Sequence, residues 1–125
     1  MSQNLYGEAS DLLLELVQDE PENVAAWTAL AQAYDRVGNI SGSSDAYRKS
    51  LAIDPDQIDV WISFGNFYFR GKSYAQAEKA YRSGLKIAPG NVKATNNLGS
   101  VLKEIGKLKE AATHFVRATK LDGRY

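Results

Sequence analysis

The sequence predicts an all-α fold of about seven helices, built from helical hairpins that stack into a solenoid. Two observations carry this prediction. The chain matches itself at an offset of 34 residues, which places Trp27 on Trp61 and Pro55 on Pro89 without a gap, and such a period is typical of helical repeats. Within each copy the apolar residues recur every three or four positions, which indicates helices and not strands.

The 34-residue frame predicts one domain over residues 1–125, with three full repeats at 24–57, 58–91 and 92–125. Residues 5–23 extend the frame backwards, because Tyr6, Leu13 and Pro21 fall on second-helix positions of the next copy. They form a half repeat whose first helix is missing. This half repeat either caps the array, as atypical terminal repeats do, or marks a place where another element supplies the missing helix.

Each full repeat is predicted to be a helix, a short turn and a second helix. In the third repeat one apolar stripe ends at Ile105 and another begins at Leu108, with Gly106 and Lys107 between them. Pro55 and Pro89 close the second helices of the first two repeats, because proline cannot continue a helix.

A glycine lies inside an aromatic-rich stretch, DVWISFGNFYF, at residues 59–69. On a helix Trp61, Gly65 and Tyr68 share one face, and a glycine there lets a neighbouring helix approach closely. The loss of about 1 kcal/mol of helix propensity is smaller than the 1.5–3 kcal/mol, roughly, from burying each flanking aromatic ring. Gly65 is therefore predicted to be a helix contact.

These residues resemble the tetratricopeptide repeat family, whose pattern is W-x2-L-G-x2-Y, then A-x3-F, then P over 34 residues. The second repeat matches through Trp61, Phe64, Gly65, Tyr68, Ala77, Tyr81 and Pro89. The first matches through Trp27, Leu30, Ala31, Tyr34, Tyr47 and Pro55, and the third through Leu98, Gly99, Leu102, Ala111 and Phe115. The run SGSSDAY weakens the second helix of the first repeat. The resemblance implies a right-handed superhelical solenoid that binds other proteins.

Charge and composition argue against several classes of partner. Fifteen basic residues balance fifteen acidic ones, so no long-range field attracts nucleic acid or an anionic membrane. The start of the chain lacks the basic and apolar regions of a signal peptide, and no run of about 18 apolar residues occurs. We expect a cytoplasmic protein with no nucleic-acid or membrane partner.

Catalysis has little support in the sequence. His114 is the only histidine and no cysteine is present, so neither a metal-ligand set nor a nucleophile pair can be assembled from these residue types. No glycine-rich phosphate loop occurs. We expect no enzymatic activity, no metal and no cofactor.

The resemblance implies that the first helix of each hairpin lines a concave peptide-binding groove. The candidate groove residues are Gln32, Arg36, Ile62, Ser63, Asn66, Phe69, Arg70, Lys93, Asn96, Asn97, Ser100 and Lys103. Asparagine carries both a donor and an acceptor, which suits the backbone of an extended peptide, and Phe69 and Ile62 could form a pocket. Basic groups outnumber acidic ones, which favours an acidic or C-terminal peptide. The alternative is a polar face that only meets water.

Two better-known binding modes of the family are not expected. Only Lys93 fits the carboxylate clamp that binds chaperone tails. Asn97, in the run ATNNLG, resembles the asparagine-lined repeats of O-GlcNAc transferase, but Ala29 and Ser63 occupy its place in the other repeats.

Self-association is an alternative function. One frame position of the second helices holds Arg48 and Arg82 in the middle copies but Leu14 and Val116 in the terminal ones. Leu14, Ala112 and Val116 therefore predict a homo-oligomer formed through the terminal helices, unless they are scattered exposed apolar residues of the ordinary kind. A further alternative is the repeat domain of a larger enzyme.

Overall fold

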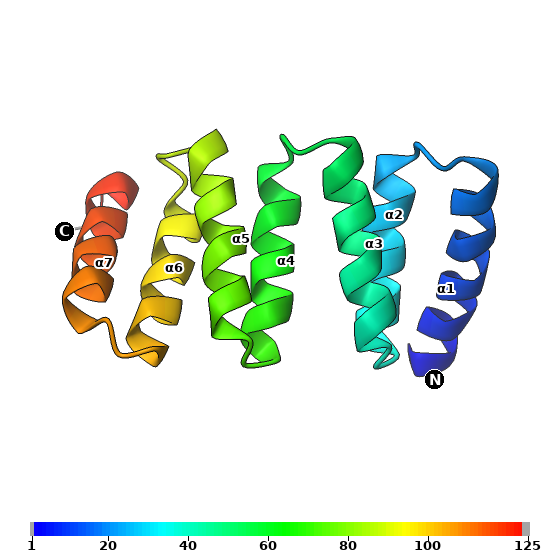
Figure 1. The fold of residues 1–125 in the computed structure, drawn as a ribbon, viewed down its shortest axis with the longest axis horizontal. Coiled ribbons are helices and arrows are strands. Elements are labelled where there is room, and N and C mark those ends of the chain that lie inside the picture. Colours follow the sequence, from blue (N-terminus) through cyan, green and yellow to red (C-terminus); the bar gives the residue numbers. More distant parts are fainter. Residues whose placement is uncertain (1, 124–125) are drawn as a thin grey trace. The chain divides into compact units, whose positions relative to one another are not determined.

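The computed structural model describes residues 2–123, with side chains from residue 5 onward, and all the regular secondary structure in this part is helical (Figure 1). Its seven helices are α1 Ser2–Asp19, α2 Val24–Arg36, α3 Ile40–Ile53, α4 Ile58–Arg70, α5 Tyr74–Ile87, α6 Val92–Glu104 and α7 Leu108–Asp122. The predicted all-α fold and its hairpins are confirmed. Within this part of the chain no helix has the length and apolar character needed to cross a membrane.

The helices divide into two compact units, residues 1–56 and residues 57–125. Along the chain, this division falls beside the predicted repeat boundary. In the first unit α1 packs on α2 and α2 on α3. The capping role of the half repeat stays a prediction. In the second unit α4 packs on α5, α5 on α6 and α6 on α7. The prediction of a single domain over residues 1–125 stays a prediction.

Asparagine and proline mark the helix ends. The side chains of Asn23, Asn39 and Asn91 each accept a hydrogen bond of 2.9–3.0 Å from a backbone N–H in the first turn of α2, α3 or α6. These bonds satisfy donors that lack an intrahelical partner. Helices α3 and α5 end at Ile53 and Ile87, two residues before the prolines predicted to stop them.

Gly65 is a contact point, as predicted. A Cβ added to Gly65 would lie 2.4 Å from the ring of Tyr81 on α5, and one added to Gly99 would lie 2.9 Å from the ring of Phe115 on α7. The Tyr81 side chain is 1% exposed, so its ring cannot swing away. The small residue on the first helix of each of these hairpins therefore sets how closely the second helix approaches.

The serine-rich helix α3 is complete despite its weak propensity. The Ser43 hydroxyl donates to the carbonyl oxygen of Ala31 at 2.7 Å, and the hydroxyls of Ser50 and Thr28 lie 2.7 Å apart. Both serines are fully buried. Buried hydroxyls with partners contribute about 1 kcal/mol each, so hydrogen bonds to α2 here support a helix that its own sequence favours little.

One turn geometry closes all three hairpins. The residues Gly38, Lys72 and Gly106 have φ values of 84°, 61° and 87°. The next N–H in each turn donates to the carbonyl five residues before it, at 2.8–2.9 Å. In the second hairpin lysine takes the left-handed position, while its neighbour Gly71 has φ −82°.

Replacing Lys72 with glycine should stabilise the protein. A left-handed residue with a Cβ carries about 1–2 kcal/mol of steric strain, part of which is offset by the larger unfolded-state entropy of glycine. We expect the free energy of unfolding in urea to rise by about 0.5–1 kcal/mol. The reverse change, Gly106→Lys, should lower the free energy of unfolding by a similar amount. Equal free energies of unfolding for the two variants would contradict the proposed backbone strain at Lys72.

Replacing Gly65 with alanine should destabilise the protein, although alanine is the better helix former. The Tyr81 ring leaves no room for a methyl group, and overpacking of this kind costs about 1–3 kcal/mol against a propensity gain of about 1 kcal/mol. The matched control is Gly7→Ala in α1, where nothing lies within 4 Å of the new Cβ. Thermal melting should show Gly7→Ala stabilised and Gly65→Ala destabilised; a more stable Gly65→Ala would refute the contact.

Candidate functional site

The second unit carries an open hollow between α4 and α6, with a volume of about 260 Å³. Its lining residues are Asn66, Phe69, Arg70, Tyr81, Asn97 and Ser100. All but Tyr81 lie on the first helices of the two hairpins and belong to the predicted groove residues. Tyr81 comes from α5, the second helix of its hairpin.

Three of these residues form a hydrogen-bonded cluster. The Tyr81 hydroxyl donates to Asn66 Oδ1, and Asn97 Nδ2 donates to the same oxygen at 3.1 Å. Two donors on one acceptor hold the Asn66 amide in a single orientation. Neither bond uses Asn66 Nδ2 or Asn97 Oδ1. The cluster therefore presents one amide donor and one amide acceptor, from facing helices, at the hollow.

Tyr81 keeps its proton throughout the physiological pH range. Burial raises the pKa of Tyr81 to about 12, while the charge of Arg70 and a hydrogen bond with Asn97 act in the opposite direction. A protonated hydroxyl is a donor, so Asn66 Oδ1 has this partner at any pH near neutrality.

The third repeat cannot form the same cluster. In the third repeat Phe115 stands where Tyr81 stands in the second, and it has no hydroxyl. In the family pattern Tyr81 is a core position, and the pattern does not predict the role of its hydroxyl group. The available signal was a tyrosine at this position, together with Asn66 on the preceding helix.

The other groove candidates of the second unit lie at different depths. Ile62 is 5% exposed and belongs to the core cluster with Tyr81 and Leu98, so its prediction as a pocket residue is corrected: on α4 it faces inward. Phe69 lines the hollow, with its ring centroid 5.5 Å from that of Tyr74. Ser63 is half-buried, and the remaining exposed candidates on α6 are Lys93, Asn96 and Lys103.

In the first unit the two candidates Gln32 and Arg36 are exposed on α2. The guanidinium carbon of Arg36 lies 5.2 Å from the ring centroid of Tyr6 on α1, which is the distance of a cation–π contact. Arg36 therefore also joins α2 to the capping helix.

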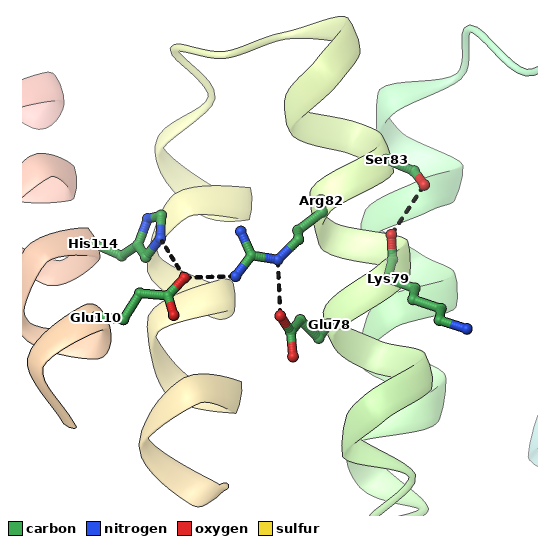
Figure 2. Close-up of polar contacts among 6 residues, drawn as sticks. All are labelled: Glu78, Lys79, Arg82, Ser83, Glu110 and His114. Carbon is green, nitrogen blue, oxygen red and sulfur yellow. Dashed lines mark hydrogen bonds and ion pairs between the residues drawn. The ribbon is translucent and has the colours of Figure 1, made fainter. Parts of the chain in front are cut away.

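A second polar cluster joins α5 to α7, as Figure 2 shows. Arg82 Nε donates to Glu78 Oε2 at 2.8 Å, and Arg82 Nη2 donates to Glu110 Oε2 at 2.6 Å. Glu110 Oε2 also lies 3.9 Å from His114 Nε2. The hydrogen bond from Arg82 lowers the pKa of Glu110, so this ion pair persists at neutral pH.

His114 is a half-buried histidine beside Glu110. Burial lowers the pKa of His114, and the charge of Arg82 adds to this effect while Glu110 opposes it, so the imidazole is neutral at pH 7. No group of three or more potential metal ligands occurs among the described residues. The cluster around Glu110 acts as a bridge between two second helices.

The predicted self-association residues are on the surface. Leu14 is 39% exposed and Val116 is 53% exposed. On α7 a hollow of about 470 Å³ is lined by Ala112, Thr113, Val116, Arg117 and Lys120.

The family described as PRP39 N-terminal HAT repeat matches residues 11–121. No curated protein matches the chain. A crystal structure of MamA matches with a TM-score of 0.90 and 22% identity, over 96% of this chain and 70% of that one. A second matches with a TM-score of 0.88 and 22% identity, over 96% and 66%. A third, titled MamA MSR-1 C2, has a TM-score of 0.81 and 22% identity, over 96% and 69%.

At this identity the likeness to MamA shows the fold alone, which is a helical-repeat fold. The chain spans about two thirds of the length of these MamA chains.

Removing the Tyr81 hydroxyl should change the alkaline stability of the protein. The folded pKa of about 12 lies above the ordinary tyrosine pKa of 10.0. The unfolded chain therefore loses this proton first, and the Tyr81 contribution is complete below pH 10 and is lost as pH rises toward 12. Two pKa units correspond to about 2–3 kcal/mol.

The Tyr81→Phe variant should lose less stability than the wild type between pH 9 and 12 when unfolding free energies are compared. The difference between the two proteins isolates Tyr81 from the other titrating groups. Parallel pH profiles would contradict the burial of an ionisable hydroxyl at this position.

Proposed function

Because the chain belongs to the PRP39 N-terminal HAT repeat family, whose units are helical hairpins similar to tetratricopeptide repeats, we propose that it is a non-catalytic protein interaction module. Its ligand is an extended peptide segment of a partner protein, bound in the hollow between α4 and α6. The repeat pattern around Trp61, Gly65 and Tyr81 supports the finer assignment of these hairpins to the tetratricopeptide type.

The Asn66–Asn97 pair carries this proposal. A peptide backbone offers one N–H and one C=O per residue, and the pair offers a matching acceptor at Asn97 Oδ1 and donor at Asn66 Nδ2. Because Tyr81 and Asn97 already hold Asn66 through its oxygen, little side-chain freedom is lost on binding. Such a pair binds backbone without reading the side chains of the ligand.

The surroundings of the pair favour an acidic segment or a C-terminal carboxylate. Arg70 lines the hollow, and Lys93 and Lys103 are exposed on α6. The first helices of the second unit also carry two acidic residues, Asp59 and Glu104, on the face predicted to line the groove. Complementary charges of this kind contribute chiefly to association rate and specificity, and Phe69 adds an apolar surface beside them.

Substituting both asparagines should abolish peptide binding while leaving the fold intact. The probe is a library of random peptides with free C-termini, selected on the wild-type protein and then measured one by one by fluorescence anisotropy. Loss of two amide partners should weaken a selected peptide by about 2–3 kcal/mol, or roughly thirtyfold to a hundredfold, in Asn66→Ala/Asn97→Ala. Circular dichroism checks that the helices remain.

Gln76→Ala is the matched control, because Gln76 is an exposed amide residue on α5 that neither lines the hollow nor belongs to the predicted groove residues. It should change the affinity less than threefold or so. The selected peptides should be rich in Asp and Glu, with affinities that fall as salt rises. Selection of peptides that bind the double variant as tightly as the wild type would overturn the proposal.

A further inference from the structure

The outer face of α1 combines exposed leucines with acidic residues beside them. Leu5 and Leu12 are 67% and 66% exposed, and the exposed Glu8, Glu15 and Asp19 share their face because the spacings are three, four and seven residues. Helix α1 contains four acidic residues and no basic one. This face therefore suits a basic surface with an apolar centre.

Helix α7 has such a surface. Leu108, Ala112 and Val116 follow one another at spacings of four residues and are exposed, Leu108 by 65% and Val116 by 53%. Lys109 and Lys120 are neighbours of this row at spacings of three and four residues. The hollow at Val116 is also edged by Lys120.

The repeat frame indicates how the two faces meet. Arg82 of α5 reaches forward to Glu110 of α7, and Glu110 lies beside His114 (Figure 2). One repeat later the position of Arg82 is held by Val116.

On α1 the positions of Glu110 and His114 are held by Glu8 and Leu12. In the repeat frame Val116 therefore corresponds to Arg82, Glu8 to Glu110 and Leu12 to His114. The two equivalents of the ion pair do not carry opposite charges.

We propose that the acidic, leucine-bearing face of α1 in one copy docks on the lysine-edged face of α7 in a second copy, head to tail. Because this contact joins two different faces, each copy still has one face free to bind a further copy. The face is small, so the association is weak and concentration-dependent. Leu12, not Leu14, is the α1 residue of this contact, because two helical residues separate their side chains by about 200°.

Charge exchange tests the proposal by sedimentation velocity on the full chain over a wide range of concentrations. Glu8→Lys/Glu15→Lys places two positive faces together, and Lys109→Glu/Lys120→Glu places two negative ones together. Each variant alone should associate at least about tenfold more weakly than the wild type. Mixing the two variants, or combining the four substitutions in one chain, should restore association because the opposite charges face each other again.

The control is Asp45→Lys/Asp56→Lys, which makes the same change in net charge as Glu8→Lys/Glu15→Lys at exposed positions on neither α1 nor α7 and should associate like the wild type. A wild type that stays monomeric at about millimolar concentration overturns the proposal, and so does a mixture that fails to associate more strongly than its components. An isologous contact between two α7 faces would instead leave the association of Glu8→Lys/Glu15→Lys at the wild-type level. Peptide binding at Asn66 and Asn97 is measured separately, so each proposal can fail without the other.

Discussion

The packing of the Tyr81 ring against Gly65 is the contact on which the rest of the second unit depends. A Cβ at Gly65 would lie 2.4 Å from that ring, so only glycine allows α5 to approach α4 so closely. The approach buries the ring within the core shared with Leu98 and Val101. It also brings the phenol oxygen within hydrogen-bonding reach of Asn66 on α4.

A core contact thereby organises the binding surface. The Tyr81 hydroxyl and Asn97 Nδ2 both donate to Asn66 Oδ1, and the remaining polar atoms of the two amides are left for a ligand. Because burial raises the pKa of Tyr81 to about 12, this arrangement does not change near neutral pH. A polar group that is held from within the core loses little freedom when a ligand binds.

Polar contacts join helices elsewhere in the chain as well. In the first unit Ser43 and Ser50 hydrogen-bond to α2, and in the second unit Arg82 joins α5 to α7 through Glu110. Val116 occupies the frame position of Arg82 on α7 and is exposed. One position of the repeat thus serves as an internal bridge in one hairpin and as an apolar surface in another.

The sequence by itself determined the helical hairpins, their 34-residue period, the ends set by Pro55 and Pro89, and the role of Gly65. These follow from the spacing of neighbouring residues and the stereochemistry of proline and glycine. Only the tertiary structure decided that Ile62 faces the core, that Lys72 takes the left-handed turn, and that the Tyr81 hydroxyl reaches Asn66. Where a side chain ends depends on the distance between packed helices, and residue spacing along one helix does not contain that distance.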